Sequence, residues 1–277
     1  MNIGCHVSAA GGIFNAPKRA HDWGCEAFQV FSRSPQGGKA PELTPEVVSH
    51  LKSELKKYKI KNFYIHTPYY INFASENNRI RYGSVSVVRD ELERGDLLGA
   101  RFVMTHLGSA KEIGEKEATK KTIEMLKKTL DGYEGTTKLL IENSAGAGAV
   151  IGDTGKEIAE IIQGVRHPAL PGICLDTQHS FASGYDWRTK ESFATAMARL
   201  EKELGKRMIK MMHANDSKVP FDAKKDRHEH IGDGHIGISG FKNIVAYAKK
   251  NDIDMILETE YDRVENDIKI LKKLRGK

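Results

Sequence analysis

Residues 172–180 read G-I-C-L-D-T-Q-H-S, and this stretch decides how the rest of the chain is interpreted. Its apolar run ends abruptly at Asp176, and His179 follows three positions later. Short apolar runs that end in this way are typical of buried strands. The stretch therefore predicts a strand that delivers a carboxylate and an imidazole to one edge of a sheet. Taken alone, it is equally well explained by a strand end whose Asp caps the next helix.

Seven other stretches show the same pattern of a short apolar run rich in β-branched and aromatic residues, and segments with helical character separate them. In residues 45–58, for example, Val48, Leu51 and Leu55 fall on one helical face. The predicted strands cover residues 3–7, 27–31, 62–66, 102–106, 139–143, 173–176, 208–213 and 255–259. The predicted helices cover residues 12–23, 45–58, 78–98, 116–130, 155–163, 189–204, 240–250 and 263–273.

Eight strands that alternate with eight helices over 277 residues predict an α/β fold, the TIM (β/α)8 barrel. An open doubly wound sheet is the alternative, but no G-x-G-x-x-G turn follows the first predicted strand. Because no linker or change of composition divides the chain, a single barrel domain over residues 1–277 is expected.

Composition and charge narrow the class of protein. No apolar run approaches the roughly 18 residues that a membrane helix requires, and the N-terminus lacks the pattern of a signal peptide. A cytoplasmic protein with no membrane partner is therefore expected. The three cysteines form no C-x-x-C pair, which argues against a disulfide framework and a thiolate zinc site. The net charge of +6 favours a polyanionic partner.

Carboxylates and imidazoles stand where six consecutive predicted strands end. The C-terminal ends of the strands in a TIM barrel share one rim, which carries the active site. Each residue alone could be a helix cap or a histidine bonded to a backbone carbonyl, whereas so dense a cluster would be costly without cations to neutralise its carboxylates. The residues are His66, His106, Glu142, Asp176 with His179 beyond it, His213 and Glu258.

A second group of candidate ligands follows the seventh predicted strand, in the run D-R-H-E-H-I-G-D-G-H at residues 226–235. Asp226 and His228 point the same way in extended backbone and can chelate one ion, although a solvated charged loop is the alternative. Nitrogen and oxygen donors without thiolates suit Zn²⁺ or Mn²⁺. Since the candidates outnumber the ligands of one tetrahedral site, more than one ion is expected, as in many enzymes that hydrolyse phosphoesters.

Six runs of sequence together resemble the endonuclease IV family of abasic-site DNA repair enzymes. They occur in order and at consistent spacing over nearly the whole chain. The runs are G-C-H-V-S-A-A-G-G (4–12), I-E-N-S-A-G (141–146), C-L-D-T-Q-H (174–179), M-H-A-N-D-S (212–217), D-R-H-E-H-I-G (226–232) and L-E-T (257–259). The resemblance implies a zinc-dependent endonuclease that hydrolyses the phosphodiester 5′ to an abasic site in double-stranded DNA during base excision repair, and we expect a monomer.

The resemblance also implies three zinc ions and distributes the candidate ligands among them. Glu142 is the implied catalytic residue, since it would bridge the first two ions and align the attacking water. Asp176 and His179 would serve different ions, the second and the third. The implied sets are His66, His106 and Glu142 for the first ion, Glu142, Asp176, His213 and Glu258 for the second, and His179, Asp226 and His228 for the third.

The same resemblance places the DNA-binding residues in the loops after the second and third strands, where the family inserts side chains into the duplex. The matching positions are Gln36, Tyr69 and Tyr70. The family often has Arg at the position of Gln36, so Arg33 and Lys39 are alternative contacts. Packing beneath the loop is the alternative role for the two tyrosines.

Two further points stay open in the sequence. Glu260 follows the L-E-T run where family members often have Pro, and we interpret it as a charge on the rim and not as a ligand. A metal-dependent sugar isomerase or epimerase on a related barrel is the alternative function. It would use Glu142, Asp176, His213 and Glu258, and it leaves His66, His106 and the loop ligands unexplained.

Overall fold

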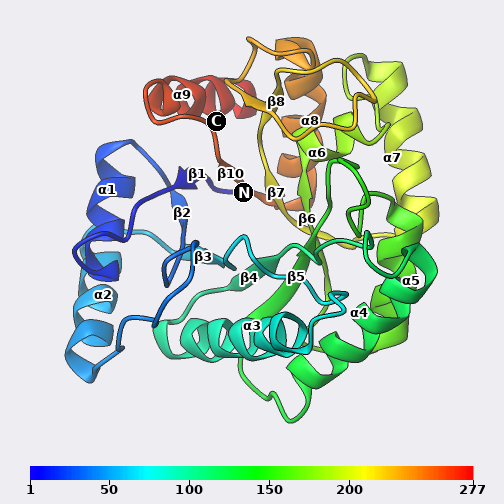
Figure 1. Ribbon diagram of the computed structural model, residues 1–277. Coiled ribbons are helices and arrows are strands. Elements are labelled where there is room, and N and C mark those ends of the chain that lie inside the picture. Colours follow the sequence, from blue (N-terminus) through cyan, green and yellow to red (C-terminus); the bar gives the residue numbers. More distant parts are fainter. Residues whose placement is uncertain (277) are drawn as a thin grey trace.

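The structure is a computed structural model that describes residues 1–276. Its parallel strands close into a barrel in the order β1-β10-β7-β6-β5-β4-β3-β2, and the helices surround it (Figure 1). The barrel strands are β1 (Ile3–His6), β2 (Ala27–Val30), β3 (Asn62–His66), β4 (Phe102–Thr105), β5 (Lys138–Glu142), β6 (Gly172–Asp176), β7 (Ile209–His213) and β10 (Asp254–Leu257). The predicted TIM barrel is confirmed.

Each predicted helix is present, and the one predicted at residues 12–23 divides into a short 3-10 turn followed by an α-helix. Among residues 1–276 no helix is long and apolar enough to cross a membrane. The helices are η1 (Ile13–Asn15), α1 (Ala16–Asp22), α2 (Pro45–Lys57), α3 (Asn78–Leu98), α4 (Glu115–Leu130), α5 (Gly155–Val165), α6 (Thr177–Ala182), α7 (Lys190–Leu204), α8 (Gly237–Asn251) and α9 (Val264–Arg275).

Three elements were not predicted: helix α6 and the two strands of a small antiparallel hairpin, β8 (Asp216–Ser217) and β9 (His228–Glu229). Helix α6 begins directly after strand β6, and its six residues are all buried, so it shows no amphipathic periodicity. The hairpin strands have two residues each, too few for an alternating pattern. All three elements lie beside the strand-end cluster, so sequence periodicity was weakest close to the site.

Helix boundaries follow from ordinary capping chemistry. The hydroxyl of Thr44 accepts a hydrogen bond from the backbone N–H of Val47 and caps α2, whose first residue is Pro45. At the other end of α3, Gly99 takes the left-handed conformation, with φ at 87°, which costs glycine little because it has no Cβ. These local signals explain why the bounds of α2 and α3 follow the predicted ones closely.

The core has two layers. Most apolar side chains fill the space between the strands and the surrounding helices, whereas a smaller set fills the barrel itself. The interior residues are Ala27, Tyr64, Phe102, Met104, Leu140, Cys174, Met211 and Ile256. All three cysteines are buried free thiols. Because apolar residues fill the middle of the barrel, its polar residues lie at its two ends: the predicted cluster at the C-terminal end of the strands and Asp254 at the other.

Candidate metal centre

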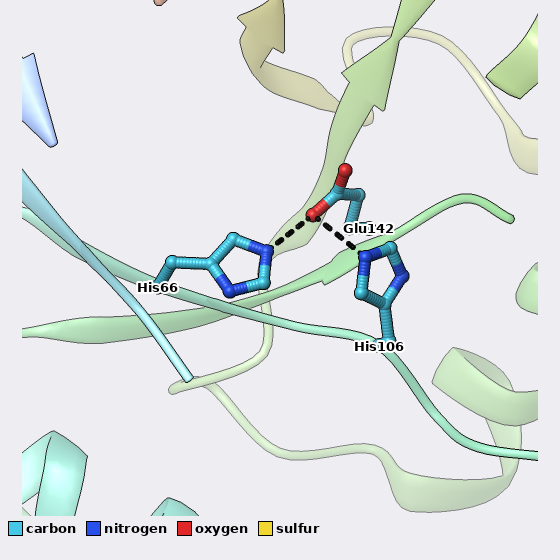
Figure 2. A group of neighbouring side chains, drawn as sticks. All are labelled: His66, His106 and Glu142. Carbon is cyan, nitrogen blue, oxygen red and sulfur yellow. Dashed lines mark hydrogen bonds and ion pairs between the residues drawn. The ribbon is translucent and has the colours of Figure 1, made fainter. Parts of the chain in front are cut away.

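Glu142, the last residue of β5, lies at the centre of the predicted cluster. Figure 2 shows His66 and His106 approaching the same carboxylate oxygen of Glu142 from two sides. The Nε2 atom of His66 lies 2.9 Å from Oε2 of Glu142, and the Nε2 atom of His106 lies 3.5 Å from it. His66 ends β3 and His106 directly follows β4, so three adjacent strands supply this first group.

The other oxygen of Glu142 faces a second group. Its Oε1 atom lies 2.9 Å from Nδ1 of His213, and that same nitrogen lies 3.3 Å from Oε2 of Glu258. Together with Asp176, these residues place four ligand atoms within 4.8 Å of one another. Glu142 therefore joins the first and second groups through separate oxygens.

A third group forms around His179, which follows β6, and His228, the first residue of β9. Asp176, His179 and His228 bring ligand atoms within 4.8 Å of one another. The Oδ1 atom of Asp226 lies 3.3 Å from Nε2 of His179 and 3.4 Å from Nε2 of His228. The structure thus brings all nine predicted ligands together. Asp176 reaches both the second and the third groups, and its assignment to the second ion alone stays a prediction.

Backbone carbonyls orient two of the imidazoles. Nδ1 of His66 donates to the carbonyl of Thr67 at 2.6 Å, and Nδ1 of His179 donates to the carbonyl of Asn143 at 3.0 Å. In the neutral ring, with its one proton on Nδ1, each Nε2 has a free lone pair that faces the carboxylates. This is the arrangement that metal-binding histidines require.

Asn143 and Asn215 support the site and were not predicted. The side-chain oxygen of Asn143 accepts the backbone N–H of Asp176 at 2.7 Å. The side-chain NH₂ of Asn215 donates to Oδ2 of Asp176 at 2.6 Å, and its oxygen accepts the backbone N–H of Glu258 at 2.8 Å. Both residues stand one or two positions from a ligand, in the runs I-E-N and H-A-N, and that adjacency was the signal available in the sequence.

The long loop after β7 is anchored by a buried carboxylate. Asp216 accepts backbone N–H groups from Gly232 at 2.9 Å and from Ile236 at 2.9 Å. These hydrogen bonds hold the two ends of the loop together and support the β8–β9 hairpin, which carries His228. A charged loop with no periodicity is thereby held against the rim, which explains how Asp226 and His228 reach His179.

The electrostatics of the cluster favour ionised carboxylates. Burial alone would raise the pKa of Glu142, but His106 and His213 beside it hold that pKa well below its usual range. Asp226 is 57% exposed, and although partial desolvation raises its pKa, the hydrogen bond and charge of His179 and the charge of His228 lower it to about 2. Several buried anions in one space require positive charge nearby. Without a metal, protonated histidines supply this charge: burial would lower the pKa of His179, but Asp176 and Asp226 raise it to about 10. Carboxylates and imidazoles are also the donors that divalent cations bind, so the chain carries metal-binding clusters.

The cluster forms the floor of a cleft of about 850 Å³. Tyr69 lines this cleft and is 70% exposed, and Tyr70 beside it is 40% exposed. Gln36 is exposed on the neighbouring loop, where the carbonyl of Pro35 accepts the backbone N–H of Tyr69 at 3.4 Å. The loops that carry the three predicted DNA contacts therefore lie side by side at the mouth of the cleft, while the contacts themselves stay predictions.

Arg33, one alternative DNA contact, is already engaged within the protein. Its side chain is 8% exposed, its Nε donates to Oε1 of Glu91 at 2.5 Å, and it also pairs with Asp90. Glu91 accepts a further hydrogen bond from Ser32 at 2.6 Å. This network ties the start of the loop to α3 and holds Arg33 at the wall of the cleft, so its role as a DNA contact stays a prediction. Lys39 is exposed on the same loop.

Comparisons with known proteins agree with the site. The family described as xylose isomerase-like TIM barrel matches residues 17–275. A protein named probable endonuclease 4 from Cenarchaeum symbiosum is 36% identical, over 100% of this chain and 99% of its own length. Its namesake from Aquifex aeolicus is 42% identical, over 88% of this chain and 86% of its own length.

Solved structures show the same relationship. Endonuclease IV from Thermus thermophilus superimposes with a TM-score of 0.87 at 26% identity, covering 99% of this chain and 98% of that one. A D-tagatose 3-epimerase-like protein has a TM-score of 0.75 at 21% identity, covering 99% of this chain and 97% of that one, and shows the shared fold alone. The chain therefore belongs to the endonuclease IV family, whose members among its relatives carry the name endonuclease 4.

Proposed function

We propose that this enzyme hydrolyses the phosphodiester on the 5′ side of an abasic site in double-stranded DNA, leaving a 3′-hydroxyl and a 5′ deoxyribose phosphate. The observation that carries the proposal is the arrangement of three donor groups around Glu142 on the floor of an open cleft. Full-length relatives named endonuclease 4 support it. A role in base excision repair follows from this substrate.

Three Zn²⁺ ions fit the three groups, with Mn²⁺ as an alternative at one of them. When bound, such ions supply a nucleophilic water at neutral pH and neutralise charge on the attacked and departing oxygens. We assign the first ion to His66, His106 and Glu142, the second to Glu142, Asp176, His213 and Glu258, and the third to His179, Asp226 and His228.

Glu142 is the proposed catalytic residue because its two oxygens face different groups. Its lowered pKa keeps the carboxyl ionised at neutral pH, so it can accept a hydrogen bond from the attacking water and orient it toward phosphorus. His66 and His213 face opposite oxygens of this carboxylate, at 2.9 Å each. In the neutral rings these nitrogens carry lone pairs, so cations held by the same donors would fix the orientation of the carboxylate that aligns the nucleophile.

Recognition of the lesion is assigned to Gln36, Tyr69 and Tyr70. Extruding a nucleotide from the duplex costs least where the base is already missing, and side chains at the mouth of the cleft would fill the gap left in the stack. The net charge of +6 supports binding to the phosphate backbone. We also propose that residues 1–277 act as one catalytic domain and as a monomer, and a cytoplasmic location stays a prediction.

A sugar isomerase or epimerase would use only the second group. It leaves His66, His106 and the Asp226–His228 pair without a role, and the epimerase structures share the fold at 21% identity or less.

A nicking assay separates the two functions. Purified protein is loaded with zinc and incubated with a duplex that contains one abasic site, with an intact duplex of the same sequence, and with a ketose. We expect a single nick 5′ to the abasic site, no cut in the intact duplex and no isomerised sugar. Isomerisation without a nick would contradict the proposal. Metal analysis should find about three zinc ions per chain.

A further inference from the structure

Gln29 is a fully buried polar residue in the middle of the second barrel strand, within the apolar run A-F-Q-V-F. Its neighbour Ala27 belongs to the barrel interior, and residues two apart on a strand point to the same face. The side chain of Gln29 is therefore directed into the barrel, directly below the rim. It is not among the nine predicted ligands.

Both ends of the Gln29 amide contact residues of the second group. Its Nε2 lies 2.7 Å from Oε1 of Glu258, and its Oε1 lies 2.7 Å from Nε2 of His213. The same Nε2 lies 3.1 Å from Nδ1 of His6, the residue opposite Gln29 on β1. One amide thus joins three side chains from three different strands or strand ends.

The chemistry of these partners fixes the direction of each hydrogen bond. The carboxylate of Glu258 can only accept, so the NH₂ of Gln29 must face it and the carbonyl oxygen must face His213. Because that oxygen also only accepts, Nε2 of His213 must carry the proton. The lone pair of His213 is then on Nδ1, which faces Oε1 of Glu142 at 2.9 Å and Oε2 of Glu258 at 3.3 Å.

We propose that Gln29 is a positioning residue of the second metal group, an inference that rests on the proposed metal-dependent function. It holds His213 in the tautomer whose Nδ1 binds the ion, and it holds Glu258 in the orientation that completes the ligand set. The second N–H of Gln29 donates to His6, so His6 helps to fix the plane of the amide. Partners of this kind typically change metal affinity or activity about 10- to 100-fold when they are removed.

The tautomer of His213 is testable in the unaltered protein. In the zinc-loaded enzyme, ¹⁵N NMR of the imidazole nitrogens, with the His213 signals assigned from a His213→Gln variant, should show a protonated Nε2 and a metal-bound Nδ1. A protonated Nδ1 would overturn the inference. This measurement requires no Gln29 variant to fold.

Gln29→Met keeps the volume of the side chain and removes the hydrogen bonds to Glu258, His213 and His6. We expect chelator competition to show one zinc ion bound about 10- to 100-fold more weakly, with the other two unchanged. We also expect kcat to fall while KM for abasic DNA changes less than about threefold, since Gln29 is buried away from the cleft surface. Thr137→Val is the control, because Thr137 is a buried polar residue before β5 whose hydroxyl bonds the carbonyl of Ala100. It should keep wild-type zinc affinity.

The outcomes separate this inference from the proposed function. Wild-type zinc affinity at every group in Gln29→Met would overturn the role of Gln29 even if the wild-type enzyme nicks abasic DNA. Conversely, weakened zinc binding in Gln29→Met together with a wild-type enzyme that does not nick abasic DNA would support the role of Gln29 and contradict the proposed function.

Discussion

The Nε2 atoms of His179 and His228 face each other at 3.3 Å. Nδ1 of His179 donates to a backbone carbonyl, so the lone pair on its Nε2 is directed at His228. Two imidazole nitrogens and a carboxylate oxygen of Asp226 converge on one point, the geometry of a cation site built partly from a loop.

Replacing His228 should empty this third group. His228→Ala removes a proposed ligand at the rim, so bound zinc should fall by about one ion per chain. Nicking should fall about 100-fold or more, because a lost catalytic ion costs several kcal/mol of transition-state stabilisation. His235→Ala is the control, since His235 is exposed on the same loop. Equal zinc content and rate in the two variants would contradict the third site.

Glu142→Gln should separate binding from chemistry. The amide keeps the shape of the side chain but loses the charge that orients the nucleophile, so single-turnover nicking should fall by about 1,000-fold or more, while a gel-shift assay still detects binding to abasic DNA. Glu260→Gln neutralises an exposed carboxylate on the same cleft and should change the rate less than about threefold. Unchanged turnover in Glu142→Gln would exclude the proposed role.

Tyr69→Ala should weaken binding to damaged DNA more than binding to intact DNA. An aromatic ring that stacks on a base contributes about 1–3 kcal/mol, so Kd for an abasic duplex should rise about 5- to 100-fold. Tyr82→Ala provides the matched comparison, because Tyr82 is an exposed tyrosine on α3 at 45% exposure. If both variants bind abasic DNA alike, Tyr69 has no special part in recognition.

Acid should remove the stability that a buried carboxylate contributes at the opposite end of the barrel. Asp254, the first residue of β10, accepts hydrogen bonds from Tyr64, from the backbone N–H of Asn2 at 2.6 Å and from Asn62 at 2.8 Å. Burial alone would raise its pKa, but these hydrogen bonds outweigh burial and lower it. A lowered folded-state pKa stabilises the fold above the unfolded value of about 3.9, and this contribution is lost as pH falls through the folded-state pKa.

Urea unfolding of Asp254→Asn and the wild type at matched metal load measures this contribution. We expect the variant to be about 1.5–3 kcal/mol less stable at pH 6, and we expect this difference to shrink as pH falls below about 4. Asp252→Asn alters an exposed carboxylate two residues away and serves as the control. A difference that is constant from pH 6 to pH 3 would show that ionisation of Asp254 contributes nothing.

The sequence by itself determined the barrel and the strand-end part of the site. Parallel strands in a barrel end at one rim, so a pattern of apolar runs closed by His66, Glu142 or Asp176 predicts that these side chains meet. The periodicity of strands and helices does not depend on distant contacts, and the structure confirmed all eight barrel strands.

Only the tertiary structure decided how the site is completed. The sequence nominated Asp226 and His228, but they reach His179 because Asp216 closes a loop without periodicity. Likewise, the sequence offered Arg33 as a DNA contact, and only the structure shows that ion pairs with α3 hold its side chain at the wall of the cleft.

The stretch at residues 172–180 shows the same division. Its strand was predictable, but the position of Asp176 within reach of two donor groups depends on which oxygen faces which partner. The partners of Gln29 likewise come only from the structure, in which His6 lies opposite it on β1 and its amide contacts His213 and Glu258. Hydrogen-bond direction depends on partners far apart in the chain, and strand periodicity carries no information about them.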